Sequence, residues 1–366
     1  MNIPFLNFEP IHNEIREEMC QAFTNVYDSH WYIMGNHLKT FEESYALYNQ
    51  TRFAVGISNG LDALYIALKT LGVGPGDEVI MPSNTFIATV MAVSFVGATP
   101  VFVEPDPSTY LLDVNASFPL SSKTKAIIPV HLYGQICQME KIMELAKNNN
   151  LFVIEDNAQA HGATYLGKKA GSFGHINATS FYPGKNLGAL GDAGACTTDD
   201  SDLVEKIKTY RNYGSRQKYV HELEGHNMRL DELQAAFLSV KLQHLNKWTL
   251  QRQDIASLYN KFLEGVGDLV LPSVGQHASH VYHLYVIRTN YRDKLQEFLN
   301  KKGIGTLIHY PIPPHLQKAY SHLNYKKGDF PIAENLANTV LSLPIWPGLN
   351  EQDILFISDS IREFFS

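Results

Sequence analysis

Cysteine is scarce in this sequence, and charge is not gathered into runs. The 366 residues include three cysteines, Cys20, Cys137 and Cys196, none spaced as a C-x-x-C pair. Neither a disulfide framework nor a metal site is therefore expected, and a reducing compartment suits the chain. The formal net charge of −7 argues against a surface for nucleic acid, so local N–H groups would have to hold an anionic ligand.

Long apolar runs and targeting signals are also missing. No apolar stretch reaches the roughly 20 residues needed to span a bilayer, and the N-terminal MNIPFLNFEP has no basic region followed by an apolar core. We therefore expect no membrane partner and a cytoplasmic location. The turn Ser58–Leu64 (SNGLDAL) lacks a G-x-G-x-x-G run, which argues against a nicotinamide-dependent dehydrogenase.

The composition that is present, 45% hydrophobic and 18% charged residues, is typical of a large globular protein. Pro10–Tyr27 has apolar residues at helical spacing and predicts one amphipathic helix. Between residues 53 and 198, short apolar strands alternate with helices, which predicts an α/β layer with a mainly parallel sheet and a ligand site at the strand C-termini. The stretch from Leu230 to about Val266 predicts one or two long helices. We therefore predict a large domain over 1–250 and a small C-terminal α+β domain over 251–366.

The strongest functional signal lies in Thr179–Cys196 (TSFYPGKNLGALGDAGAC), where one lysine stands between an apolar strand and a run of glycines. Lys185 follows Pro183-Gly184, where the backbone turns sharply and few side chains crowd it. Such a position suits an amine that meets a ligand, although in isolation a solvated surface lysine would give the same pattern.

Two other segments make the predicted ligand more specific. Leu151–Asp156 (LFVIED) is typical of a buried parallel strand that ends in carboxylates. Because successive strand residues face opposite ways, only one of Glu155 and Asp156 can face a given ligand. Val55–Leu68 predicts a strand, a turn and a helix whose first N–H groups can bind a phosphate. A lysine, a strand-end acid and a phosphate cradle are the parts of a site for pyridoxal 5'-phosphate (PLP).

An ordered set of motifs gives the chain a family resemblance. The motifs are WYIMGNHLKTFE (31–42), SNGLDAL (58–64), PSNTFIAT (82–89), PVHLYGQ (129–135), EDNAQAHGA (155–163), the lysine stretch, HNMRLDELQAAFL (226–238) and HYPIPPHLQKAY (309–320). Together they resemble the DegT/DnrJ/EryC1/StrS family of sugar aminotransferases over nearly the whole chain. The resemblance implies an aspartate-aminotransferase-like fold of type I, which is a three-layer α/β sandwich. It also implies PLP as the cofactor, with pyridoxamine 5'-phosphate (PMP) as its aminated form.

The resemblance assigns chemistry to three residues. Lys185 would form a Schiff base with PLP and, once released, move a proton between substrate and cofactor. Asp156 would hold the proton on the pyridine nitrogen, and Gln159 would hydrogen-bond the phenolic oxygen. From the residues alone, Asp156 could equally cap a helix, and Gln159 could be an ordinary buried amide.

Further cofactor contacts are implied at the ring face and at the phosphate. Phe86 matches a position where a flat side chain stacks on the pyridine ring, although an aromatic residue on a helix face is more often core. The phosphate would meet the N–H groups of Gly60 and Leu61, helped by Asn59 and the Ser180 hydroxyl. The family more often has Ser-Gly-Thr where this chain has Asn59-Gly60-Leu61, so a hydroxyl is lost while the backbone cradle is kept.

The resemblance also implies residues at a subunit boundary and at the substrate entrance. Asn227 matches an asparagine that reaches the phosphate of the neighbouring subunit's cofactor, which implies a homodimer with shared sites. Its alternative role is a helix N-cap ahead of Leu230. His309 and Tyr310 resemble residues that line the sugar-nucleotide entrance, and Tyr182 is placed near the substrate by its proximity to Lys185.

The lysine stretch most resembles the branch of the family that aminates C-3 of dTDP-linked 3-keto-6-deoxyhexoses, with L-glutamate as the donor. The implied products are 3-amino-3,6-dideoxyhexose units of antibiotics or of surface polysaccharides such as lipopolysaccharide and S-layer glycans. A C-4 aminotransferase acting on a UDP- or dTDP-linked 4-keto sugar shares nearly every motif and stays open. A non-catalytic regulatory protein of the same fold would predict an eroded site, whereas Lys185, Asp156, Gln159 and Ser180 are all present.

Overall fold

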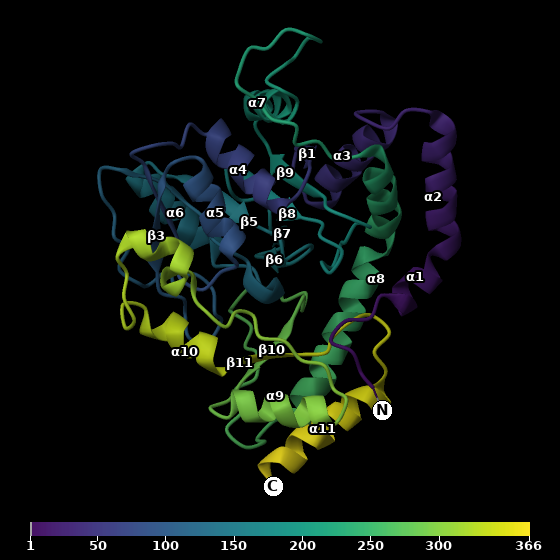
Figure 1. The fold of residues 1–366 in the computed structure, drawn as a ribbon, viewed down its shortest axis with the longest axis vertical. Coiled ribbons are helices and arrows are strands. Elements are labelled where there is room, and N and C mark those ends of the chain that lie inside the picture. The colour runs from purple at the N-terminus through teal and green to yellow at the C-terminus, as the bar shows by residue number, and fades with distance from the viewer. Residues whose placement is uncertain (1) are drawn as a thin grey trace.

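The computed structural model describes residues 2–366, so Met1, the first residue of the predicted large domain, lies outside it. A seven-stranded sheet in the order β1-β9-β8-β5-β4-β2-β3 forms the centre of the upper body in Figure 1. Its strands are β1 (Phe53–Ile57), β2 (Glu78–Pro82), β3 (Thr99–Val103), β4 (Thr124–Ile127), β5 (Phe152–Asp156), β8 (Ile176–Ser180) and β9 (Gly194–Thr198). β9 pairs antiparallel with both β1 and β8, whereas the other pairs are parallel. The sheet is therefore mostly parallel, as predicted.

Helices cover both faces of this sheet, as alternating strand residues show. Val55 and Ile57 of β1 pack into one core with α4 (Gly60–Thr70). Ala54, which precedes Val55 and faces the other way, packs into a second core with α3 (Asn36–Tyr48) and α8 (Glu232–Leu263). The remaining helices of this body are α5 (Ile87–Phe95), α6 (Met139–Asn149) and α7 (Ser201–Arg211). The predicted three-layer α/β sandwich of fold type I is confirmed.

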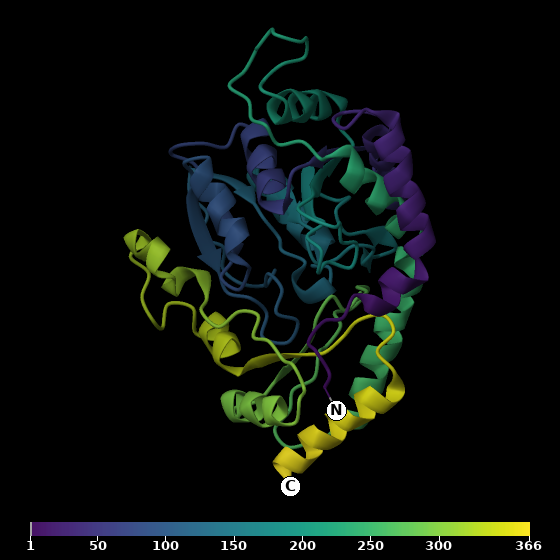
Figure 2. The same cartoon turned by 45° about the vertical axis from the view of Figure 1, so that its right-hand side comes forward.

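The N-terminal prediction of one helix over 10–27 is wrong, because the chain forms α1 (Glu9–Glu14) and α2 (Arg16–Ser29). Ile15 separates them with a backbone φ of −108° and ψ of 14°, which leaves the helical region while its side chain is fully buried. α2 then packs along α8, as Figure 2 shows. Phe23 of α2 is 49% exposed, so its apolar stripe is not all core.

The lower lobe in Figure 1 has its own apolar core. It contains the antiparallel pair β10 (Tyr285–Arg288) and β11 (Val340–Leu343), α9 (Arg292–Lys301), α11 (Glu351–Phe365) and the second half of α8. α8 runs unbroken through residue 250, so the division into 1–250 and 251–366 stays a prediction.

The shorter elements are the hairpin β6 (Thr164–Tyr165) and β7 (Lys168–Lys169), the helix α10 (Pro331–Thr339) and the 3-10 turns η1 (Leu132–Gly134), η2 (Pro314–Leu316) and η3 (Lys318–Leu323). Over residues 2–366, no helix combines the length and apolar character that crossing a membrane requires.

Candidate active site

The N-terminus of α4 meets the C-terminal end of β8 because two glycines allow the close approach. A Cβ on Gly60 would lie 2.5 Å from Ser180 Cβ, and a Cβ on Gly194 would lie 2.5 Å from the carbonyl carbon of Asn59. Asn59 caps the helix by accepting a hydrogen bond from Asp62 N at 2.9 Å, and its Nδ2 donates to Asp62 Oδ2 at 2.8 Å. The first turn of α4, including Gly60 and the following residue, Leu61, thus lies beside the Ser180 hydroxyl, whereas the Asn59 amide is used within the helix start.

Lys185 stands in a tight turn that leaves β8. Its N–H donates to Tyr182 O at 2.8 Å, and Tyr182 N donates to Ser180 Oγ at 3.2 Å. The side chain is partly buried. Burial lowers the pKa of Lys185 to about 8, an effect that the Asp156 carboxylate partly opposes. The turn therefore presents an amine that is far easier to deprotonate than an ordinary lysine.

Asp156 is the strand-end acid that shares this site. It is 7% exposed, and its Oδ2 accepts a hydrogen bond from Thr89 Oγ1 of α5 at 2.8 Å. Its Oδ1 accepts from Ala158 N at 3.2 Å. Asp156 and Lys185 therefore come together from β5 and from the turn after β8. Thr89 carried no sequence signal for this contact beyond its place in PSNTFIAT.

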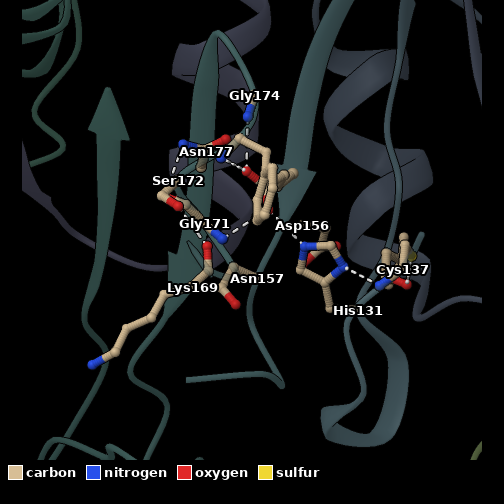
Figure 3. A network of polar contacts seen from close by, with 12 residues as sticks. His131, Cys137, Asp156, Asn157, Lys169, Gly171, Ser172, Gly174 and Asn177 are labelled. Carbon is tan, nitrogen blue, oxygen red and sulfur yellow. Dashed lines mark hydrogen bonds and ion pairs between the residues drawn. The ribbon is translucent and has the colours of Figure 1, made fainter. Parts of the chain in front are cut away.

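Glu155, one residue earlier, points the other way and is fully buried. Its carboxylate accepts from His131 Nε2 at 2.8 Å and from the N–H groups of Gly171 at 2.7 Å, Phe173 at 2.6 Å and Gly174 at 2.8 Å. Figure 3 shows His131 and the loop that holds the two glycines around this strand end. Four donors satisfy the carboxylate, so Glu155 joins three segments of the chain.

His131 donates to Glu155 through Nε2 in this network. Cys137 N donates to His131 Nδ1 at 3.2 Å, which places the ring proton on Nε2, facing Glu155. In the same segment, His131 N donates to Asp156 O at 3.1 Å, and Asp156 N donates to Pro129 O at 2.9 Å. The network therefore fixes the backbone from which the Asp156 side chain projects.

The substitution Glu155→Gln is expected to destabilise the fold by about 3 kcal/mol, since an amide NH2 would face at least one of these buried donors and leave it unpaired. Urea unfolding followed by far-UV circular dichroism measures this loss. The exposed Glu297, which pairs with Lys301 across one turn of α9, supplies the control. Glu297→Gln should leave the free energy of unfolding close to that of the wild type, because the pair is exposed to water. Equal stabilities of the two variants would contradict the assigned network.

Gln159 and Tyr310 meet on the side of the site that faces the lower lobe. Gln159 Oε1 accepts from Tyr133 N at 2.6 Å, and its Nε2 donates to the Tyr310 hydroxyl at 3.1 Å. The Tyr133 hydroxyl donates to the carbonyl of His309. Phe86, at the start of α5, is 50% exposed and lies with its ring centroid 5.3 Å from that of Tyr310. Tyr133, which joins the two lobes here, carried no sequence signal beyond its place in PVHLYGQ.

Neutral histidines surround the amine of Lys185. Burial, followed by the positive charge of Lys185, lowers the pKa of His161 to about 3 and that of His309 to about 4. The same two causes, with burial the larger, hold the pKa of His283 well below its usual range. His283 also contacts Asn186, since its Nδ1 lies 3.3 Å from Asn186 Oδ1. His283 carried no signal by itself, because fifteen histidines are spread over the sequence, whereas Asn186 lies in the lysine stretch but was given no role.

Two predicted site residues stand apart from this cluster. Tyr182 is 58% exposed at the rim of the lysine turn. Asn227 is exposed on the loop between α7 and α8, where it forms a β-bridge with Asn212. The N-cap of α8 is Asp231, so the alternative role of Asn227 as a helix cap is wrong. Within residues 2–366, no hydrogen bond joins Asn227 to the turn that carries Lys185.

This geometry agrees with the comparison to protein families. The model of the DegT/DnrJ/EryC1/StrS aminotransferase family matches residues 13–362. The chain belongs to this family. The aminotransferase is 46% identical over 363 residues to dTDP-3-amino-3,4,6-trideoxy-alpha-D-glucose transaminase of Streptomyces venezuelae, covering 99% of this chain and 96% of the relative. It is 47% identical over 363 residues to dTDP-3-amino-3,6-dideoxy-alpha-D-galactopyranose transaminase of Aneurinibacillus thermoaerophilus, covering 99% of each.

A third relative has a different kind of name. The pleiotropic regulatory protein of Geobacillus stearothermophilus is 45% identical over 368 residues, covering 100% of this chain and 99% of the relative. Overall similarity therefore does not by itself separate enzymes from proteins named for regulation. The distinction has to rest on whether the residues of the site are present.

Solved structures agree with the fold and the cofactor. The crystal structure of S. venezuelae DesV in complex with a ketimine intermediate has a TM-score of 0.98 and 46% identity, covering 100% of this chain and 99% of that one. NtdA of Bacillus subtilis, solved with bound cofactor PMP, has a TM-score of 0.91 and 33% identity, covering 99% and 85%.

PLP is the cofactor of this aminotransferase, and the residues present fit it. The pKa of Lys185 is lowered, the Asp156 carboxylate is close enough to act on that pKa, and the helix start has no Cβ in the way at Gly60. No cluster of three or more metal-ligating side chains occurs within residues 2–366.

Proposed function

We propose that this aminotransferase moves the amino group of L-glutamate to the C-3 keto group of a dTDP-linked 3-keto-6-deoxyhexose and yields a dTDP-3-amino-3,6-dideoxyhexose. The observation that carries the chemistry is the pairing of a lysine of lowered pKa with a buried strand-end carboxylate. The two relatives named as 3-amino-sugar transaminases support the C-3 position. The intact site disfavours a purely regulatory role.

The residues around Lys185 then take defined roles. When bound, PLP supplies an aldehyde that receives the amino group and a ring that accepts electrons. Lys185 Nζ would bind that aldehyde and, once released, would move a proton between the substrate carbon and the cofactor. The Asp156 carboxylate keeps a proton on the pyridine nitrogen, and Gln159 orients the phenolic oxygen through its Nε2. Because His161, His283 and His309 have lowered pKa values, the amine of Lys185 is the strongest base among these groups.

The remaining predicted residues bind the cofactor and admit the sugar. Phosphate meets the first N–H groups of α4, at Gly60 and Leu61, together with the Ser180 hydroxyl and the helix cap Asn59. The half-exposed ring of Phe86 would hold the cofactor by stacking on one face of the pyridine. His309, Tyr310 and Tyr182 line the entrance for the sugar nucleotide.

A homodimer in the cytoplasm completes the proposal. Asn227 is exposed and has no role in its own site, which suits a residue that reaches the phosphate of a second subunit. Large apolar side chains also gather, exposed, on α2 and on the segment that follows it. They are Phe23, Tyr27, Trp31, Tyr32 and Met34. Burial of this surface against a second copy would remove it from water.

The decisive experiment supplies PLP and L-glutamate together with, in parallel, dTDP-linked 3-keto-6-deoxy, 3-keto-4,6-dideoxy and 4-keto-6-deoxy hexoses. Mass spectrometry detects the amino sugar, and NMR fixes the position of its nitrogen. We expect nitrogen at C-3 of the 3-keto-6-deoxyhexose. Nitrogen at C-3 of the dideoxy sugar alone would change the substrate, nitrogen only at C-4 would change the branch, and no product from any of the sugars would favour the regulatory alternative.

A further inference from the structure

Lys241 of α8 is a buried cation that the chemistry above does not use. It is 2% exposed, and burial lowers its pKa to about 8. Its Nζ donates a hydrogen bond to the carbonyl of Gly188 at 2.7 Å. Within residues 2–366, no carboxylate lies in ion-pair distance of this ammonium group. A buried ammonium without a counter-ion is costly, so a compensating role is expected.

Gly188 belongs to the loop Pro183–Gly191 that carries Lys185. A Cβ on Gly188 would lie 2.2 Å from Pro183 O, so the loop folds back on itself at this residue. Ala189 N donates to Phe181 O at 2.8 Å and closes the loop where it rejoins the strand end. The buried Gly188 carbonyl therefore sits at the point that sets the shape of the whole loop.

Side chains hold this loop at three places. Asn186 Nδ2 donates to Val281 O at 3.1 Å near its start. Leu190 N donates to Gln234 Oε1 of α8 at 2.8 Å near its end. Lys241 holds the middle. Two of the three ties come from α8, which packs against α3 and reaches into both cores, so the helix is a rigid reference for the loop.

We propose that Lys241 is a positioning residue for Lys185: its bond to the Gly188 carbonyl holds the loop so that the amine of Lys185 meets the cofactor aldehyde. The tie needs a donor that spans the distance from the helix backbone to a buried carbonyl, and the long lysine side chain provides it. An apolar side chain of the same length would leave that carbonyl unpaired. The assignment rests on the proposed role of Lys185.

The test compares Lys241→Met with Lys241→Gln, which keeps a shorter, neutral donor. Lys247→Met is the matched control on the same helix, since Lys247 is 59% exposed and pairs with Glu14 at the surface at 2.7 Å. Hydrogen–deuterium exchange of the full chain without PLP reports on the loop. The absorbance of bound PLP, kcat and the KM for L-glutamate report on the loaded enzyme.

In Lys241→Met we expect amide exchange over residues 186–190 to rise on the order of tenfold while α3 stays protected. We expect kcat to fall roughly tenfold to a hundredfold, with little change in KM and a shifted pH titration of the cofactor band. Loop exchange and kcat of Lys241→Gln should lie between those of Lys241→Met and the wild type. If Lys241→Met does not fold, Lys241→Gln tests the proposal in its place. Lys247→Met should match the wild type.

The proposal is overturned if a folded Lys241→Met has the kcat and the loop exchange of the wild type. It is also overturned if kcat falls while loop exchange and the cofactor band stay unchanged. If the wild type itself forms no amino sugar, the proposed function fails. The exchange measurement still decides whether Lys241 holds the loop.

Discussion

The substitution Lys185→Ala yields a protein that still binds PLP but transaminates at least about 10³-fold more slowly than the wild type. The phosphate contacts at α4 and the Asp156 carboxylate remain, so binding weakens less than turnover. In the proposed function, the lost group is both the amine that binds the aldehyde and the base that moves the proton. Burial, the larger cause of the lowered pKa values of His161 and His309, persists in the variant and keeps these histidines weak bases. Single-turnover kinetics with L-glutamate, together with a fluorescence titration of PLP, separate the two effects.

Borohydride treatment adds a direct chemical readout to this prediction. The wild type should retain PLP covalently on Lys185 after reduction, as mapped by peptide mass spectrometry, and Lys185→Ala should retain none. Lys147, exposed in the last turn of α6, supplies the control, because Lys147→Ala should behave as the wild type. Retained turnover in Lys185→Ala, or a label on another lysine, would remove Lys185 from the site.

Much of the fold follows from local patterns that tertiary contacts do not override. The apolar segment LFVIED becomes β5 and ends in the two acids as expected. The prediction over 10–27 failed because hydrophobic periodicity is nearly the same across a kink. Ile15 keeps its place in the apolar stripe and is buried, yet its backbone breaks the helix.

The candidate site, like the fold, was predictable from the sequence only in part. The proximity of Lys185, Asp156 and the start of α4 could be predicted, because glycines and strand ends mark them in the sequence, whereas their roles stay predictions. Strand alternation could not say which of Glu155 and Asp156 faces the lysine, since it fixes only that they differ, and the choice of Asp156 came from the family resemblance. His283 and Lys241 come from distant segments and meet the lysine loop only through folding, so no local spacing indicates them.

The substitution Asp156→Asn is expected to lower kcat roughly 10²- to 10³-fold, because it removes the charge that keeps the pyridine nitrogen protonated. The amide oxygen can still accept the hydrogen bond of Thr89, and only the longer contact from Ala158 N, at 3.2 Å, loses its acceptor. The free energy of unfolding should therefore fall by about 1 kcal/mol. Stopped-flow absorbance during the half-reaction with L-glutamate measures the rate, and urea unfolding measures the stability.

Glu155→Gln is the matched partner of this variant, because the two isosteric changes stand side by side on β5 and point in opposite directions. Asp156→Asn should lose rate while keeping most of its stability. Glu155→Gln should lose stability, and the part that stays folded should keep a larger share of its rate. The opposite result, with the rate lost at Glu155 and kept at Asp156, would mean that the strand presents the other acid to the cofactor. Equal losses at both positions would mean that neither carboxylate acts on the pyridine nitrogen separately from its structural role.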